Sequence, residues 1–294
     1  MRIALIGDIH TYRLAVAPWR LFNKRLLGQV NLWFNRRFRF RRELLPPVWE
    51  RVTSIDPEML LFSGDVSTCA LQSEFADVSA MIKPLTDRIP TVMTPGNHDR
   101  YTFGATKHKL MERELSHVMP DSNPHFQKLT DRWQLLVLDS AFPQKLWAEG
   151  FIGQQQIEAA RQHIRSMADD QSLIVMCHYP ALRVPPYIHE GPGHELRDAD
   201  AVCDLLRETA RLRGPVVYLH GHIHRPWCFR PGGEGLEHIV DVNAGAPCNR
   251  VQTYPFGQGF WQLDLHQDDP HIELIHHCRA DDGEQWNESA HAID

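Results

Sequence analysis

Residues 1–10 read Met1-Arg-Ile-Ala-Leu-Ile-Gly-Asp-Ile-His10, an apolar run that ends in a glycine, an aspartate and a histidine. The run has the length and the continuous apolar character of a strand that is covered on both faces. Four later apolar runs also end in short polar motifs, which read Ser63-Gly-Asp65, Pro95-Gly-Asn-His-Asp99, Cys177-His-Tyr-Pro180 and His220-Gly-His-Ile-His224. Because open α/β sheets bind ligands at the carboxyl ends of their strands, the five motifs predict a functional site along one edge of such a sheet.

Apolar runs and helical patterns alternate along most of the chain. The runs predict strands over 2–7, 58–63, 90–95, 133–139, 172–177, 215–220, 237–242, 259–265 and 271–277. Helical spacing of apolar residues predicts helices near 43–55, 73–88, 104–118, 153–168 and 198–212. Alternation of this kind is typical of an α/β domain, and the consecutive strands after residue 237 predict a second sheet closed by hairpins. We expect one domain over residues 1–280, followed by a polar tail over 281–294 that frays.

The motif residues are of the types that bind transition metals. Aspartate, asparagine and histidine suit Mn, Fe or Zn, and the lack of paired cysteines in the motifs argues against a structural zinc site with thiolate ligands. Two residues of an extended chain that are separated by one position project to the same side, so Asp8 with His10, and His222 with His224, can each grip one ion. The predicted ligands are Asp8, His10, Asp65, Asn97, His178, His222 and His224. Strand alternation gives the neighbouring Tyr179 and His220 a structural role instead.

These motifs resemble those of the calcineurin-like metallophosphoesterases, in particular the bacterial phosphodiesterase branch. The segments that match are Asp8-Ile-His10, Gly64-Asp65, Gly96-Asn-His-Asp99, His178, Gly221-His-Ile-His224 and the following Asn243-Ala-Gly-Ala-Pro247. The resemblance covers residues 2 to about 265. It implies a four-layer α/β/β/α sandwich of two mixed sheets, with a centre of two divalent or trivalent metal ions across the ends of the sheets.

The resemblance also implies a role for each motif residue. One metal ion would be bound by Asp8, His10, Asp65 and His224, and the second by Asp65, Asn97, His178 and His222, with Asp65 bridging. A hydroxide between the ions would attack phosphorus, and His98 would protonate the leaving oxygen or orient the phosphate. Some family members pair this histidine with an aspartate three residues after the bridging one. That position is Thr68 here, which leaves the partner of His98 open, with Asp99 as one alternative.

Residues 11–42 form a basic and aromatic segment within an acidic chain. They hold nine Lys and Arg residues and no acidic residue, whereas the net charge of the chain is −6. We expect a helical insertion over 11–45, which begins one residue after a metal ligand and therefore rises near the site. Lipid contact and ordinary packing of a helical hairpin are the two interpretations of this segment. The acidic remainder argues against a nucleic-acid partner.

The function predicted from these features is hydrolysis of a phosphodiester or pyrophosphate bond, in a membrane lipid precursor such as a UDP-linked acyl sugar. The first alternative is a soluble phosphodiesterase that acts on cyclic nucleotides or glycerophosphodiesters. The second is a metal-bound scaffold without catalysis, which would not need His98. Arg100, His189 and His194 follow predicted ligands in loops, which makes them candidate substrate contacts.

Composition sets the remaining expectations. A content of 43% hydrophobic and 23% charged residues excludes intrinsic disorder. No stretch approaches the roughly 20 apolar residues of a membrane span, and the chain turns polar too early after Met1 for a secretory signal. The six cysteines are scattered without a CxxC pair, which is typical of reduced thiols. We therefore expect a cytoplasmic protein, in peripheral contact with the inner face of the membrane through residues 11–42.

Overall fold

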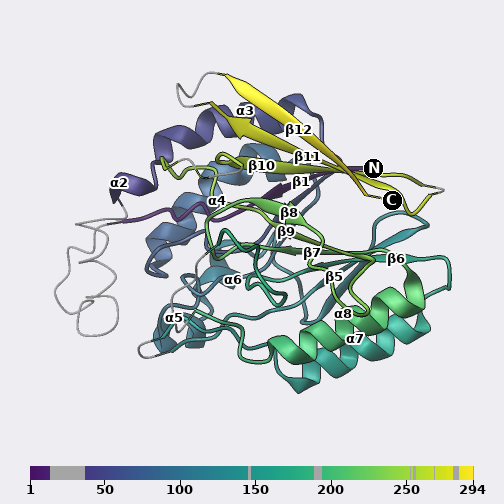
Figure 1. The fold of residues 1–294 in the computed structure, drawn as a ribbon. Helices are drawn as coiled ribbons and strands as arrows, with labels where there is room; N and C mark the ends of the chain where they lie inside the picture. Colours follow the sequence, from purple (N-terminus) through teal and green to yellow (C-terminus); the bar gives the residue numbers. More distant parts are fainter. Residues whose placement is uncertain are drawn as a thin grey trace.

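The strands of the described residues pair into two six-stranded sheets (Figure 1). The computed structural model describes residues 1–13, 37–144, 147–188, 194–251, 253, 256–267, 269–280 and 285–293. The order of the first sheet is β12 (Trp286–Ile293), β11 (Ile272–Arg279), β10 (Gly259–Leu265), β1 (Arg2–Ile6), β2 (Met59–Phe62) and β3 (Thr91–Met93). The order of the second sheet is β4 (His125–Lys128), β5 (Trp133–Val137), β6 (Ser172–Met176), β7 (Val216–His220), β9 (Ile239–Asn243) and β8 (Trp227–Phe229).

Both sheets are mixed. Strands β1, β2 and β3 are parallel in the first sheet, and β5, β6, β7 and β9 are parallel in the second. Their helical connections and neighbours are α2 (Arg37–Arg39), the 3₁₀ helix η3 (Arg42–Leu44), α3 (Leu45–Ser54), α4 (Gln72–Thr86), α5 (Phe103–Lys107), α6 (Leu110–Glu114), α7 (Gln154–Ser166) and α8 (Ala199–Arg213). The carboxyl ends of the parallel strands therefore lie along one edge of each sheet.

Three apolar clusters hold four layers together. Alternate residues of β1 face opposite sides, so that Leu5 packs in the cluster between the two sheets and Ile6 packs in the cluster beneath α3 and α4. On the far side, Val175 of β6 packs in a third cluster with residues of α7 and α8. Both faces of the central strands are thus covered, which explains their continuous apolar runs. The predicted α/β/β/α sandwich is confirmed.

The predicted strands are all present, with ends that differ by at most a few residues, and the main difference among the helices concerns 104–118. This segment forms two short helices, α5 and α6, instead of one. The chain breaks at Lys109, whose φ of 49° lies in the left-handed region and cannot continue an α-helix. Strands β4 and β8 were not predicted; they are the two edge strands of the second sheet and are not the continuous buried runs that mark its central strands.

The prediction of a frayed polar tail over 281–294 is wrong for its described part. Residues 286–293 form β12, which pairs antiparallel with β11 along its whole length. The Trp286 ring packs against Phe260, and the His291 ring packs against Trp261. These two ring contacts and the backbone hydrogen bonds to β11 stabilise the strand. The composition of the segment is too polar to predict a strand by itself.

Most of the predicted helical insertion over 11–45 lies outside the described residues. Its described part consists of residues 11–13 and of residues 37–45, which contain α2 and η3 and are called the return segment below. Proline is tolerated in the first turn of a helix, and Pro46 and Pro47 accordingly open α3 directly after η3. None of the described helices is both long enough and apolar enough to cross a bilayer.

A buried histidine on β11 predicts how stability depends on pH. The His276 ring packs against Trp261 and Phe256, and burial lowers its pKa to about 3. The unfolded chain binds a proton at this position below about pH 6.5, so the stability linked to His276 is complete above that pH and decreases as the pH falls toward 3. Between pH 7 and pH 5, His276 should account for about 2 kcal/mol of the decrease in the free energy of unfolding. We expect this part of the decrease to be absent in His276→Phe, measured by urea denaturation.

The matched control for this substitution is His266→Gln, because the His266 side chain is exposed after β10. Its pH dependence should follow that of the unaltered protein. An unchanged pH dependence in His276→Phe would contradict the assignment of a neutral buried ring.

Candidate metal centre

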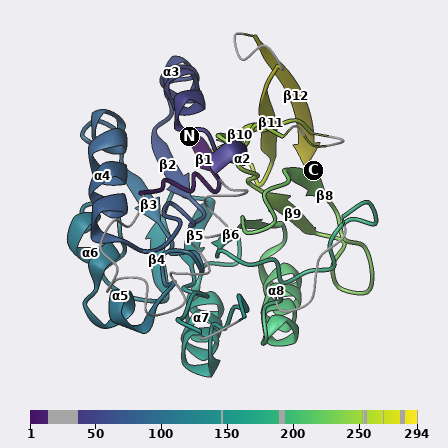
Figure 2. The ribbon, with the colours of Figure 1, turned by 90° about the vertical axis from the view of Figure 1, so that its left-hand side faces the viewer.

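The five motifs follow five parallel strands whose carboxyl ends face the same side of the molecule. Figure 2 is viewed from this side, at which the chain leaves β1. The loop after β1 carries Asp8 and His10, and the loop after β2 carries Asp65. The loops after β3, β6 and β7 carry the other predicted residues, which are Asn97 and His98, His178, and His222 and His224. The structure brings all of them together from both sheets.

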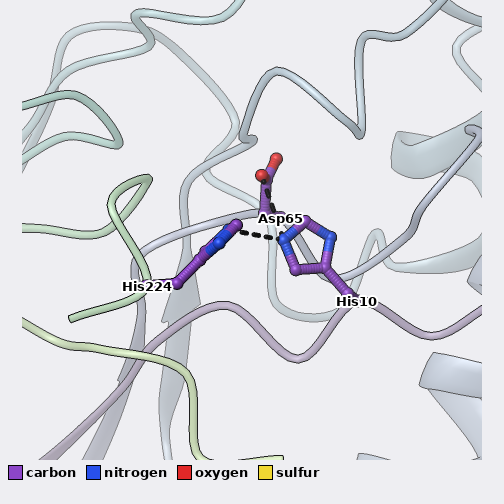
Figure 3. A group of neighbouring side chains, drawn as sticks. All are labelled: His10, Asp65 and His224. Carbon is purple, nitrogen blue, oxygen red and sulfur yellow. Dashed lines mark hydrogen bonds and ion pairs between the residues drawn. The ribbon is translucent and has the colours of Figure 1, made fainter. Parts of the chain in front are cut away.

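A first group consists of His10, Asp65 and His224, whose side chains point toward one another (Figure 3). The Nε2 atoms of the two histidines are 2.8 Å apart, and His10 Nε2 lies 3.5 Å from Asp65 Oδ2. Oδ2 of Asp8 is 3.8 Å from His224 Nε2. Imidazole nitrogens and carboxylate oxygens that converge in this way are the donor set of a metal site.

A second group consists of Asp65, His178 and His222. His178 Nε2 lies 3.5 Å from Asp65 Oδ1. The side-chain oxygen of Asn97 is 3.2 Å from His178 Nε2 and 2.9 Å from His222 Nδ1. Asp65 belongs to both groups and presents Oδ1 to one and Oδ2 to the other, so that its carboxylate can bridge two ions.

Backbone carbonyls fix three of the histidine rings. His10 Nδ1 donates to Ser67 O at 3.3 Å, and His178 Nδ1 donates to Ser63 O at 2.8 Å. His222 donates through Nε2 to the carbonyl of His194 at 3.0 Å. Because a carbonyl only accepts, each of these nitrogens carries a proton, and the opposite nitrogen is the atom that can present a lone pair to a bound ion. This outer support is typical of metal-binding histidines.

The backbone is strained at four of the predicted ligands. His10, Asp65, His222 and His224 have φ values of 41°, 52°, 69° and 59°, in the left-handed region that residues with a side chain rarely adopt. Glycine is required next to them, because a Cβ atom on Gly96 would collide with the Asp65 carboxylate and one on Gly221 would lie 2.7 Å from Asp8 Oδ1. Strain of this kind is concentrated at functional sites.

The electrostatics of the site fit bound cations. Asp8 and Asp65 are fully buried, and both oxygens of Asp8 and Oδ2 of Asp65 receive no hydrogen bond. Burial raises the pKa of Asp8 well above its ordinary range. Burial acts on Asp65 in the same direction, but the charges of His178, His98 and His10 hold its pKa well below that range. Buried carboxylates without donors are costly unless a cation compensates them, so the residues present fit a pair of metal ions.

His98 lies beside the centre and is not one of the predicted metal ligands. Its backbone N–H donates to Asp65 Oδ1 at 2.8 Å, and its Nδ1 donates to the backbone carbonyl of Thr68 at 2.7 Å. The Tyr101 ring stacks on it with centroids 5.3 Å apart. Thr68, at the position where the resemblance implies an aspartate in some family members, thus supplies a carbonyl here, and this carbonyl orients the His98 ring.

Asp99, the alternative partner of His98, instead connects two loops. Its carboxylate accepts hydrogen bonds from the backbone of Gly96 at 2.9 Å and from the backbone and hydroxyl of Ser67 at 2.9 and 2.8 Å. Burial raises its pKa to about 6. These contacts join the motif after β2 to the motif after β3.

The three predicted substrate contacts have different outcomes. Arg100 is buried, and its guanidinium lies 2.7 Å from Glu112 and 3.5 Å from Asp139, which gives it a structural role. His194 contacts the site through its carbonyl, and its ring centroid is 5.7 Å from that of His222. His189 lies outside the described residues.

Several residues that support the centre were not singled out from the sequence. Gln258 donates to the carbonyl of His224 at 2.9 Å, and Asn243 donates to the carbonyl of Gly221 at 2.6 Å. His220 and Trp227 both hydrogen-bond the buried Asp241, which confirms the structural role expected for His220. Their partners are distant in the sequence, and only Asn243 carried a signal, through the matched Asn243–Pro247 segment.

Two stacked mixed sheets, with carboxylates and imidazoles gathered at their carboxyl ends around a shared aspartate, define the class of binuclear metallohydrolases. The chain belongs to the calcineurin-like phosphoesterase family, whose model matches residues 1–226. The family resemblance drawn from the five motifs is therefore confirmed.

Two individual proteins illustrate the relationship. A probable cyclic nucleotide phosphodiesterase of Rhodococcus erythropolis is 27% identical over 171 residues, which cover 57% of this chain and 52% of that protein. The purple acid phosphatase PPD1 from yellow lupin seeds superimposes with a TM-score of 0.60 at 14% identity, over 98% of this chain and 53% of the phosphatase. The chain thus spans about half the length of both, and the second likeness shows the fold alone.

The shared position of Asp65 predicts the effect of its removal. Asp65→Asn keeps the shape of the side chain but removes the charge that both groups share, so we expect the purified protein to lose most of its capacity to bind two equivalents of Mn²⁺ or Zn²⁺, measured by elemental analysis after dialysis. Asp139→Asn is the control, because the Asp139 carboxylate is also largely removed from solvent but pairs with Arg100 and not with a predicted ligand. Full retention of two ions in Asp65→Asn would contradict the bridging role.

Proposed function

We propose that this protein hydrolyses a phosphodiester or pyrophosphate bond at a centre of two metal ions. The observation that carries the proposal is the pair of ligand groups that share Asp65, within a chain of the calcineurin-like phosphoesterase family. The first ion is assigned to Asp8, His10, Asp65 and His224, and the second to Asp65, Asn97, His178 and His222. The donor types suit Mn, Fe or Zn.

Bound metal ions and the side chains around them would have different roles in the reaction. Two bound ions would supply Lewis acidity toward the phosphoryl oxygens and would lower the pKa of a water molecule. His98 is assigned to bind the phosphate or to deliver a proton to the leaving oxygen. Its Nδ1 proton is committed to the Thr68 carbonyl, so Nε2 is the atom that exchanges a proton. The Thr68 and Tyr101 contacts hold the ring in one orientation, which is the requirement for a positioned acid.

The role of His98 predicts a separation of metal binding from turnover. His98→Ala should retain two metal ions and reduce kcat by roughly 10²- to 10⁴-fold, the range for loss of a general acid. The measurement is hydrolysis of bis(p-nitrophenyl) phosphate beside p-nitrophenyl phosphate, with metal-stripped protein refilled with Mn²⁺ and with Asp65→Asn as the inactive control.

The outcomes of this assay separate the candidate functions. Hydrolysis of the diester in preference to the monoester supports the proposal, and normal turnover by His98→Ala would contradict the role of that residue. Two bound ions with hydrolysis of neither compound nor of acylated or cyclic substrates would favour a scaffold that binds metal without catalysis.

A lipid precursor is the substrate favoured by the surface next to the centre. The return segment of the insertion presents an exposed Phe38, and the Arg37 guanidinium lies over its ring at 4.6 Å. Arg39 is also exposed. Two residues after Phe38, the Phe40 ring contacts His10. A cationic and aromatic surface at this position suits a substrate that combines acyl chains with an anionic phosphate group, such as a UDP-linked acyl sugar at a membrane surface.

A cyclic nucleotide is the alternative substrate. The relative from Rhodococcus erythropolis, a probable cyclic nucleotide phosphodiesterase, favours it. A small nucleotide would use the centre without depending on the exposed return segment of the insertion.

Charge reversal distinguishes these substrates. Arg37→Glu combined with Arg39→Glu should raise KM by roughly 10-fold for an acylated nucleotide diphosphate, because each exposed ion pair with the phosphates contributes up to about 1 kcal/mol and a factor of ten corresponds to about 1.4 kcal/mol. KM for cyclic AMP and for bis(p-nitrophenyl) phosphate should stay unchanged. Arg207→Glu combined with Arg211→Glu is the control with an equal change of charge, because both arginines are exposed on α8, beyond the second sheet. Equal changes for acylated and small substrates would contradict the lipid assignment.

A further inference from the structure

The four histidines assigned as metal ligands form two three-ring clusters, each with one aromatic side chain. In the first cluster, the Phe40 ring lies 4.5 Å from the His10 ring and 5.1 Å from the His224 ring, which are themselves 4.7 Å apart. The second cluster contains Tyr179, His178 and His222. The Tyr179 ring lies 5.2 Å from that of His178 and 4.3 Å from that of His222, and the two imidazoles are 5.2 Å apart.

Phe40 comes from the return segment of the insertion and not from a strand end. It pairs with Asn249 in an isolated antiparallel bridge. The hydrogen bonds on either side are Arg41 N–H to Cys248 O at 2.9 Å and Arg250 N–H to Arg39 O at 2.7 Å. This pairing buries the Phe40 ring to 3% exposure, with its plane steeply inclined to both imidazoles, at 63° to His10 and 80° to His224.

Both ends of the insertion are also fixed to α4. Arg13, on the outgoing side, pairs with Asp77 at 2.6 Å, and Arg42, on the return side, pairs with the same carboxylate at 3.4 Å. The position of Phe40 against the histidines is therefore set by two separate attachments, the backbone pairing with Asn249 and the ion pair at Asp77.

Tyr179 is held by a different set of contacts. Its hydroxyl donates to the carbonyl of Ala148 at 2.6 Å, and its own carbonyl accepts from Tyr218 at 2.7 Å and from the Cys177 thiol at 3.1 Å. Gly150 packs directly on the ring, at a distance that leaves no room for a Cβ atom. No residue of this set contacts Phe40 or the first histidine pair among the described interactions, so the two clusters are supported independently.

We propose that Phe40 and Tyr179 are positioning residues, each of which sets the metal affinity of one of the two ligand groups. The proposal rests on the proposed metal centre. A histidine binds a metal well only when its ring already lies in the plane that aims the lone pair at the ion. An aromatic ring packed against two imidazoles restricts their rotation, and three of the four histidines (His10, His222 and His224) also have a left-handed backbone conformation. The insertion thereby takes part in the metal centre through Phe40.

The test measures Zn²⁺ affinity in proteins that retain one group at a time. His222→Ala leaves the first group intact, and His10→Ala leaves the second. Competition with a chromophoric chelator then gives the dissociation constant of the remaining group. Phe40→Leu preserves bulk but removes the ring, and Tyr179→Leu does the same for the second cluster.

The expected result is a crossed pattern. Phe40→Leu should weaken Zn²⁺ binding by roughly 10- to 100-fold, the usual effect of losing outer support, in the His222→Ala protein and leave it unchanged in the His10→Ala protein. Tyr179→Leu should show the reverse. Tyr179→Phe keeps the ring and should keep the affinity. Phe75→Leu is the control for core damage, because Phe75 is a fully buried residue of α4 in the same apolar cluster as Phe40.

Three outcomes would overturn the proposal. Equal weakening of both groups by either leucine variant, or no weakening by either, would exclude separate positioning roles. A loss in Phe75→Leu as large as that in Phe40→Leu would assign the effect to general loosening of the core. The third outcome concerns the metal centre itself. If neither His10→Ala nor His222→Ala binds Zn²⁺ more tightly than the His10→Ala/His222→Ala double variant, the proposed metal centre is refuted. This outcome differs from the first two, which concern only the roles of Phe40 and Tyr179.

Discussion

The burial of two carboxylates between the ends of two sheets is the constraint on which the rest of the site depends. Asp8 and Asp65 are both fully buried and three of their four oxygens receive no hydrogen bond. Such groups are stable only beside positive charge. The histidines of three further loops surround them, and cations bound at the centre would complete the compensation. The first sheet carries both aspartates and the second carries His178, His222 and His224, so the site exists only where the two sheets are packed together.

The neighbouring loops are built around the same constraint. Glycine stands where backbone must pass within contact of a carboxylate, as at Gly96 and Gly221. Carbonyl oxygens of otherwise unremarkable residues, such as Ser63 and Thr68, fix the rings that face the centre. The energy stored in four left-handed backbone conformations is offset by the apolar packing of the three core clusters. The site is therefore rigid because it is attached to strand ends, and chemistry that requires accurate alignment benefits from that rigidity.

The insertion contacts the centre at its second end as well, through Phe40. The buried Phe40 ring lies against His10 and His224, while Phe38, two residues earlier, is exposed. One short stretch thus faces the proposed metal ions on one side and solvent on the other. A single element can in this way influence both the retention of metal and the choice of substrate, which connects the two parts of the proposed function.

The sequence by itself determined the sandwich and the seven candidate ligands, because buried strands read as continuous apolar runs and each motif stands at the end of one. It could not reveal β12, whose order comes from pairing with β11 and from Trp286 and His291 packing on residues of β10, the strand beyond it. It also could not show that a carbonyl at Thr68 orients His98, since every residue carries a carbonyl and only its direction matters. The roles of Arg100 and Phe40 were likewise decided by the tertiary structure. A guanidinium or a phenyl ring has no function until distant segments supply its neighbours, here Glu112 and Asp139 for one and two histidines for the other.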